Sequence, residues 1–270
     1  MNVPTQPPRA TPERSLWREV AVPSEHGGWG LTLEPVLLGL LVAPSWPGVA
    51  IGLAALLAFL VRTPAKLVGV DVRRDRWLPR TRFALRLALG ELVLLVALVT
   101  WATWSAGWQW WSPVLIALPF VVVEGWYDVR SRSRRLVPEL CGAVGVAASG
   151  AAIVIAGDGG SSLAAGAWLI LTARSVGAIT FVRAQIDQAR HGVVEVRGSD
   201  VAQVASVAVA AVAWLVDDRL WIGSVSLAII AVVQMWWSRR PPPAITVIGV
   251  RQMVIGVMVV FASAAGVWIA

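Results

Sequence analysis

Long apolar stretches alternate with short polar ones along nearly the whole chain. The core of a bilayer holds no water, so a segment that crosses it must satisfy its own backbone hydrogen bonds, which a helix of about 20 apolar residues does. The first two stretches are short and divided by Pro44 and Pro47, so they could be two spans or a re-entrant hairpin. The pattern predicts an all-α polytopic membrane bundle with nine spans, at 29–43, 47–61, 84–103, 112–126, 138–157, 163–182, 200–216, 220–237 and 251–269.

The basic residues support this count, because they fall in alternate connections. With the N-terminus inside, the inner stretches hold 21 of the 23 Lys and Arg residues, and the exceptions are Arg174 and Arg219. Short loops rich in Lys and Arg stay on the cytoplasmic side of a membrane. We therefore expect the N-terminus inside and the C-terminus outside. Residues 1–25 are predicted to be a cytoplasmic tail, and residues 26–270 a single transmembrane domain.

The composition excludes several other classes of protein. Hydrophobic residues make up 57% of the chain and charged residues 14%, whereas a soluble domain carries about 25% charged residues. The single cysteine, Cys141, excludes an internal disulfide. The basic inner loops account for the net charge of +7, so we expect the lipid bilayer and no nucleic acid as a partner. The oligomeric state stays open.

Tryptophans are concentrated in the connection at 101–111, which is predicted to lie outside. Indole rings favour the headgroup layer, because they are apolar with one N–H donor. This segment is interpreted as an interfacial belt, with a ligand lid as the alternative.

Several charged side chains lie within or near the predicted spans, and at membrane depth each costs roughly 2.5–3.5 kcal/mol to insert. Two interpretations of these residues are open. They could be carboxylate–arginine pairs that hold helices together, or they could line a polar cavity open to the cytoplasm. These residues are Glu34, Glu91, Glu124, Asp128 and Arg174.

The entrance to the first span reads Pro-Ser-Glu-His-Gly-Gly-Trp-Gly at 23–30. Adjacent glycines permit a close approach of backbones, and a histidine titrates near neutral pH. Helix capping by Ser24 and Glu25 is one interpretation. We favour a binding role for Glu25, His26 and Trp29.

Two inner loops carry aspartates among arginines. Asp71 and Asp75 are four residues apart, so on a helix both carboxylates would face one way. With Arg73 and Arg74, they could hold Mg²⁺ and an anionic diphosphate. The alternative is a solvated basic loop.

After the sixth span, Arg183, Asp187 and Arg190 would form one helical stripe. An ion pair within this helix is the plainer interpretation of the stripe.

The Pro-x-Glu-His-Gly-x-Trp segment at 23–29, the many spans and Val182-Arg183-x-x-Ile186 resemble the YwiC-like membrane protein family. The likeness extends from about residue 23 to the end. It implies a multi-pass protein of the bacterial cytoplasmic membrane, and it brings no assigned reaction.

A more distant likeness is to UbiA-type prenyltransferases, which resemble nine-helix bundles with Asp-rich loops after the second and sixth helices. In that family these loops bind Mg²⁺ and a prenyl diphosphate. The first motif of the family survives here only as Asp71-x-x-x-Asp75, with Leu67 and Val68 in place of an Asn and an Asp. The second motif is reduced to Asp187.

Three hypotheses follow. The first, suggested by the UbiA likeness, is a prenyltransferase-like protein in which Asp71, Asp75 and Asp187 hold Mg²⁺ and act in catalysis on an isoprenoid diphosphate. The second is a transporter for a small anion or a lipid, and the third is a scaffold whose basic face binds anionic lipid. The substrate-binding candidates are Glu25, His26, Trp29, Glu34, Arg73, Arg74, Glu124, Tyr127, Asp128, Arg183 and Arg190.

Overall fold

The computed structural model describes residue 20 and residues 26–130, 135–192 and 195–270. Helices make up nearly all of this part of the chain, and it contains no strand. The helices are α2 (His26–Val42), α3 (Trp46–Arg73), α4 (Pro79–Ala106), α5 (Trp111–Val129), α6 (Leu136–Ala156), α7 (Ser161–His191), α8 (Arg197–Val216), α9 (Trp221–Trp237) and α10 (Ile245–Ile269), with a 3₁₀ turn at Asp218–Leu220.

Each predicted span corresponds to one of these helices, so the all-α membrane bundle is confirmed. Seven of the described helices are long and apolar enough to cross a membrane, and α2 is a shorter apolar helix. The stretch at 29–61 forms two helices that meet at a tight turn. Ser45 caps the second of them, because its hydroxyl oxygen accepts a hydrogen bond from the backbone N–H of Gly48 at 3.0 Å.

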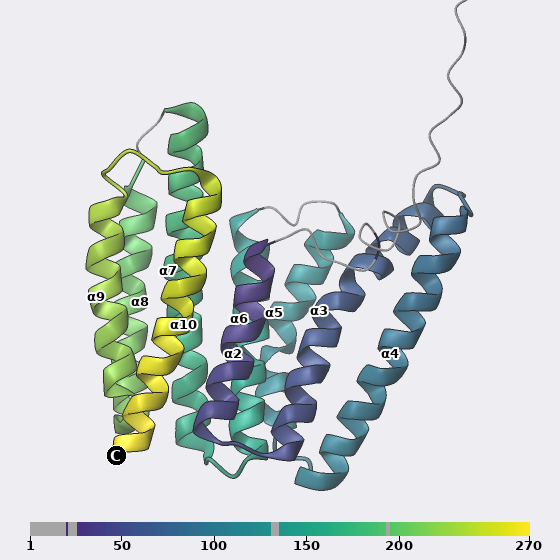
Figure 1. Cartoon of the computed structure of the whole chain (residues 1–270), viewed down its shortest axis with the longest axis horizontal. Helices are drawn as coiled ribbons and strands as arrows, with labels where there is room; N and C mark the ends of the chain where they lie inside the picture. Colours follow the sequence, from purple (N-terminus) through teal and green to yellow (C-terminus); the bar gives the residue numbers. More distant parts are fainter. Residues whose placement is uncertain (1–19, 21–25, 131–134, 193–194) are drawn as a thin grey trace, which may run out of the picture.

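The connections lie alternately at the two ends of the bundle (Figure 1). The turns that follow α3 and α9 are at the upper end, while the turns that follow α2 and α6 and the C-terminus are at the lower end. The described parts of the basic inner stretches therefore lie at one end of the molecule. This is the alternation that the charge pattern predicts.

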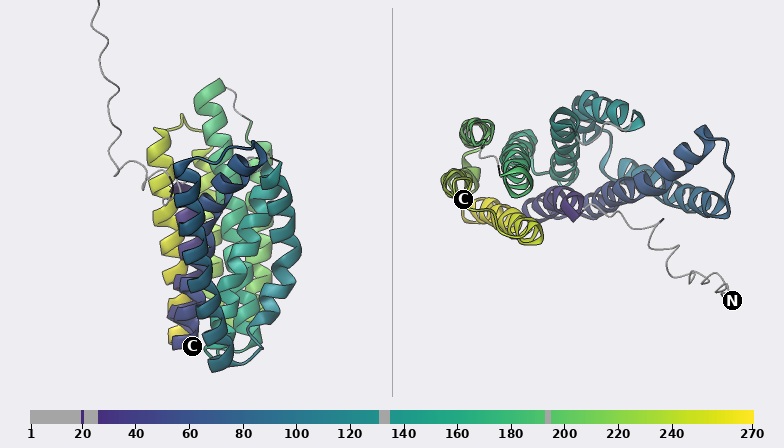
Figure 2. Two further views of the ribbon diagram at one scale, coloured as in Figure 1. Left: turned by 90° about the vertical axis from the view of Figure 1, so that its right-hand side faces the viewer. Right: turned by 90° about the horizontal axis from the view of Figure 1, so that it is seen from above.

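The helices form an elongated layer in which α6 and α7 are central. Helices α7 to α10 make one group, α3 to α5 lie at the other side, and α2 stands between them (Figures 1 and 2). In α6 and in α7, 61% of the most apolar segment of the helix is buried inside the protein, against 6% in α4. The small residues of α6 suit this central place, because they let helix backbones approach closely.

The contact between α2 and α6 shows how close that approach is. A Cβ atom on Gly39 would lie 2.9 Å from the carbonyl oxygen of Gly150, and one on Gly150 would lie 2.9 Å from the carbonyl oxygen of Pro35. Larger residues would push the two helices apart. This packing fixes the position of Glu34, which directly precedes Pro35.

Candidate functional site

An arginine and a glutamate meet inside the bundle, where three helices converge. The Nη2 atom of Arg174 in α7 lies 3.6 Å from Oε1 of Glu34 in α2, and the two side chains are 4% and 7% exposed. The same Nη2 donates a hydrogen bond of 2.5 Å to the backbone carbonyl of Gln252 in α10. Two charges that the sequence analysis noted separately therefore lie together.

Three buried glutamines extend this site across the neighbouring helices. Gln203 in α8 donates from Nε2 to the backbone carbonyl of Gly177 at 2.9 Å and to Oε1 of Gln234 in α9 at 2.7 Å. Gln234 in turn donates to Oε1 of Gln252 at 3.3 Å. We call Glu34, Arg174, Gln203, Gln234 and Gln252 the polar cluster.

The polar cluster is incompletely paired. Within the described residues, neither Nε of Arg174 nor Nε2 of Gln252 has a hydrogen-bond partner, and both atoms are buried. Leaving a buried donor unpaired costs about 1–3 kcal/mol. Both unpaired groups are donors, so the cluster is suited to a ligand that accepts hydrogen bonds.

A glycine and a proline, Gly256 and Pro35, shape the surroundings of the polar cluster. The Glu34 carboxylate packs directly against Gly256 of α10, so a Cβ atom at that position would overlap it. Pro35 has no backbone N–H, so it cannot donate to the carbonyl of Leu31 one turn earlier, and proline bends helices at such positions. Helix α2 is therefore continuous but lacks one backbone hydrogen bond beside its buried charge.

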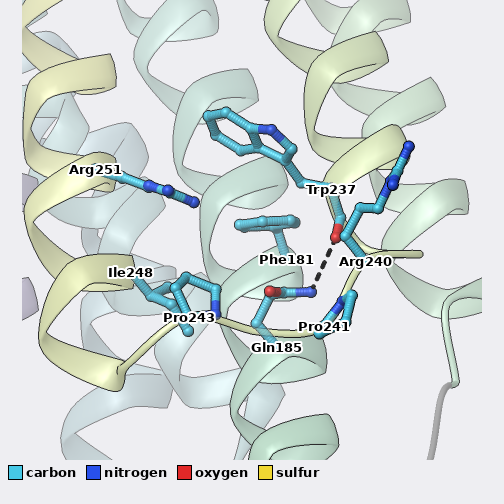
Figure 3. A pocket seen from close by; sticks show the side chains of 8 residues that line it. All are labelled: Phe181, Gln185, Trp237, Arg240, Pro241, Pro243, Ile248 and Arg251. Carbon is cyan, nitrogen blue, oxygen red and sulfur yellow. Dashed lines mark hydrogen bonds between the residues drawn. The ribbon is translucent and has the colours of Figure 1, made fainter.

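A pocket with about 330 Å³ of empty volume, open to the surface, lies at the end of the bundle where the basic residues gather. Its lining residues come from α7, α9, α10 and the α9–α10 connection (Figure 3). Trp237 stands one turn from Gln234, and Arg251 directly precedes Gln252, so the pocket lies next to the glutamines of the polar cluster. The lining residues are Phe181, Gln185, Trp237, Arg240, Pro241, Pro243, Ile248 and Arg251.

A second set of charges joins α3 to α5 near the same end. Arg62 pairs with Glu124 at 2.8 Å and with Asp128 at 3.1 Å, and Lys66 pairs with Asp128 at 2.7 Å. Arg62 and Lys66 are 36% and 47% exposed. For Glu124 and Asp128, the structure therefore shows the carboxylate–arginine pairs of the first interpretation.

The expected pair of aligned carboxylates on the first loop does not form, and this part of the prediction was wrong. Helix α3 ends at Arg73, and Asp75 lies in the turn beyond it with a φ of +50°. Asp71 is buried, and its Oδ2 accepts a hydrogen bond of 2.6 Å from the hydroxyl of Thr81. Arg80 also reaches Asp71, at 3.4 Å, so this carboxylate holds the α3–α4 turn together.

The other predicted site residues are spread over several helices. Arg183 pairs with Glu139 of α6 at 2.9 Å, whereas Asp187 and Arg190 are exposed near the end of α7. The Trp29 ring packs edge-on against Phe59, with centroids 5.2 Å apart. Arg73 and Arg74 are exposed, Tyr127 is half-buried in α5, and Glu25 and the side chain of His26 lie outside the described residues.

No three His, Cys, Asp or Glu side chains in the described part of the chain group so that they could hold a metal ion. Asp71, Asp75 and Asp187 therefore do not form the common ligand set that the sequence suggested. Asp71 and Asp75 belong to the α3–α4 region, and Asp187 belongs to α7.

The Trp-rich connection is partly exposed and partly packed against the bundle, and the ligand lid stays a prediction. Trp104 and Trp108 are 88% and 75% exposed, as residues of an interfacial belt would be. Trp110 is buried and stacks on Trp111 with ring centroids 4.6 Å apart. The buried part of this connection packs against the ends of α3, α4 and α6.

Residues 22–154 match the family model of YwiC-like proteins. The chain is YwiC-like over this region. The YwiC-like region contains α2 to α5 and nearly all of α6, so it includes Glu34 but not the rest of the polar cluster. No curated protein and no solved structure matches the chain. With its apolar helices, the chain is a multi-pass membrane protein that is YwiC-like over residues 22–154, and the UbiA-type likeness stays a prediction.

The three glutamines of the polar cluster were not among the predicted site residues, because the prediction depended on charged residues within the apolar stretches. Gln203, Gln234 and Gln252 each lie inside a predicted span, and an amide at membrane depth also needs a partner. That signal was available in the sequence.

Proposed function

We propose that this protein is a small-anion transporter whose binding site is the polar cluster. The observation that carries the proposal is the buried Glu34–Arg174 pair, which has unpaired donors on Arg174 and on Gln252. Ionisable residues inside membrane spans are expensive, and they mark substrate or proton pathways. Arginine suits this role, because its guanidinium stays charged and offers several N–H donors.

The charge balance of the pair suggests coupling to protons. The charged group within ion-pair distance of Glu34 in the described residues is Arg174. If Glu34 takes up a proton, Arg174 loses its counter-charge, and an anion bound at its Nε would restore neutrality. An anion and a proton would then move together.

The placement of the cluster supports movement between two sides. Glu34 belongs to α2, which packs on α6, whereas Arg174 and the glutamines belong to the α7–α10 group. In transporters, substrate sites lie between such groups. We propose that the inner end of this transporter faces the cytoplasm of the bacterial cytoplasmic membrane.

Flux measurements in proteoliposomes test the proposal. Chloride, nitrate, acetate and phosphate would be supplied separately, with and without a pH gradient. We expect wild-type protein to take up at least one of them in a pH-dependent way. The double variant E34Q/R174Q keeps the site neutral and should fold, but its flux should fall to the level of empty vesicles.

The control variant is E91Q, which removes an intramembrane carboxylate in α4 that is not part of the polar cluster. It should leave flux unchanged. Equal flux from wild type and E34Q/R174Q would reject the proposal.

The prenyltransferase-type reaction with Mg²⁺ stays a prediction that depends on the distant family likeness. The geometry supports this reaction less than anion transport, because Thr81 and Arg80 already bind the carboxylate of Asp71. Incubation of the purified protein with Mg²⁺, a prenyl diphosphate and a phenol acceptor tests it directly.

A further inference from the structure

The pocket between α7, α9 and α10 has the chemistry of an anion site that is separate from the polar cluster. About 330 Å³ of space, part of it open to solvent, lies among its lining residues. Two arginines, Arg240 and Arg251, line it together with the amide of Gln185. None of the described residues that line it carries a carboxylate.

The arginines of the pocket differ from their neighbour Arg239. Arg239 forms a two-pronged ion pair with Asp200, with N–O distances of 3.2 and 2.6 Å. Among the described residues, neither Arg240 nor Arg251 has such a carboxylate partner. Arg251 lies 5.1 Å from the ring centroid of Trp237, and Arg240 lies 4.6 Å from that of Trp236. Indole faces hold a guanidinium in place without neutralising its charge.

Gln185 contributes a donor that is weakly used. The residue is 2% exposed, and its Nε2 lies 3.4 Å from Oε1 of Gln188 and 3.5 Å from the carbonyl oxygen of Trp237 (Figure 3). Hydrogen bonds of this length are at the limit of the interaction. A ligand oxygen in the pocket would therefore compete easily for this N–H.

The surroundings also favour an anion. In Figure 3, the guanidinium of Arg251 points from α10 toward Phe181 and Trp237, while Arg240 stands on the far side of Trp237. Helix α10 begins at Ile245, two residues after Pro243, so the partial positive charge of its first turn lies beside the pocket. Phe181 and Ile248 add apolar surface next to these charges.

We propose that this pocket binds a phosphate group, with Arg251 and Gln185 as the direct donors and Arg240 as the cation at the rim. The group comes from the headgroup of an anionic lipid or from free phosphate, because both present the same oxygens. Basic pockets between membrane helices at the inner surface are the type of site that holds lipid headgroups. The proposal does not depend on transport through the polar cluster.

Native mass spectrometry of the full chain in detergent tests the lipid source. Phosphatidylglycerol would be added to wild type, R251Q, R240Q/R251Q and the control R239Q, and phosphatidylcholine would be added in parallel. Phosphatidylcholine carries the same phosphodiester with a compensating cation. We expect preferential retention of phosphatidylglycerol, reduced about fivefold by R251Q and about twenty-five-fold by the double variant. R239Q should bind like wild type.

Thermal unfolding of the same variants with inorganic phosphate tests the free source. A ligand that binds only the folded protein raises its melting temperature. A rise in wild type and in R239Q, but not in R240Q/R251Q, would assign the pocket to free phosphate. The proposal is overturned if phosphatidylglycerol shows no preference and phosphate gives no stabilisation. It is also overturned if R239Q loses binding as strongly as R251Q does.

Discussion

The Arg62–Glu124–Asp128 set and the Glu34–Arg174 pair use the same kinds of charged group at different depths. In the first set, an arginine and a lysine that are more than a third exposed serve two carboxylates at distances of 2.7–3.1 Å. In the second, both side chains are buried, and the nitrogen–oxygen distance between them is 3.6 Å. Close pairing thus accompanies access to water, and loose pairing accompanies burial.

This difference separates a structural role from a ligand-binding one. Charges at the end of a helix can pair closely and keep some contact with water, so they join helices at low cost. Charges at depth have no water to replace a missing partner, so a loose buried pair with unpaired donors is costly. An anion would satisfy those donors, and the predictions below test the contrast in order of expected effect.

The largest effect is expected from removing one member of the buried pair. R174Q leaves the Glu34 carboxylate buried without its counter-charge, which should lower the free energy of unfolding by about 3–5 kcal/mol. R62Q removes a partly exposed partner and leaves Lys66 beside Asp128, so it should cost about 1 kcal/mol or less. Unfolding of both variants in detergent by increasing denaturant measures the two values.

The double variant E34Q/R174Q should regain most of the lost stability, because it removes both charges. Similar losses for R62Q and R174Q would erase the distinction between the two sets.

A smaller effect is expected from filling the space beside Glu34. G256A places a methyl group where the carboxylate packs, so it should cost about 1–3 kcal/mol and reduce flux. G249A is the matched control on the same helix, because a Cβ atom there would meet nothing within 4 Å. Melting temperatures and flux of the two variants give the comparison. If G256A behaves like G249A, the cluster tolerates rearrangement and the packing argument is wrong.

The smallest effect concerns an ion pair at the opposite end of the bundle, between α8 and α9. Hydrogen bonds from the Arg219 side chain hold the pKa of Asp217 below its ordinary value, and burial of the carboxyl opposes this shift. A lowered pKa stabilises the folded protein above the ordinary value of about 3.9, and this contribution is lost as the pH falls through the lower folded pKa. Because Arg219 is 37% exposed, we expect only a few tenths to about 1 kcal/mol.

D217N should therefore melt slightly below wild type near neutral pH, and the gap should close in acid. Melting curves recorded between neutral pH and about pH 3 measure this gap. A gap that widens as the pH falls would contradict the sign of the shift.

The architecture could be predicted from the sequence, because the bilayer constrains it strongly. Apolar length and the alternation of basic loops located the nine helices α2 to α10 of the described part of the chain. Even so, α3 continues to Arg73 and α7 to His191, well beyond the predicted spans. Apolar runs mark the part of a helix that lies in lipid, whereas a helix can continue into water.

The site was harder to predict, because it depends on contacts between distant parts of the chain. Glu34 and Arg174 are 140 positions apart, and spacing within one segment says nothing about their meeting. The spacing of Asp71 and Asp75 was misleading, because the helix ends between them. Local periodicity predicts a shared face only where the helix continues.

Helix α4 packs mainly on α3 and presents most of its surface to the surroundings. Its tilt is therefore set by one protein neighbour and by the hydrocarbon thickness around it. Membranes with longer acyl chains should change the crossing angle of this hairpin while leaving the α7–α10 group in place. Lipid composition would then change the tilt of α4 at one edge of the molecule and leave the rest unchanged.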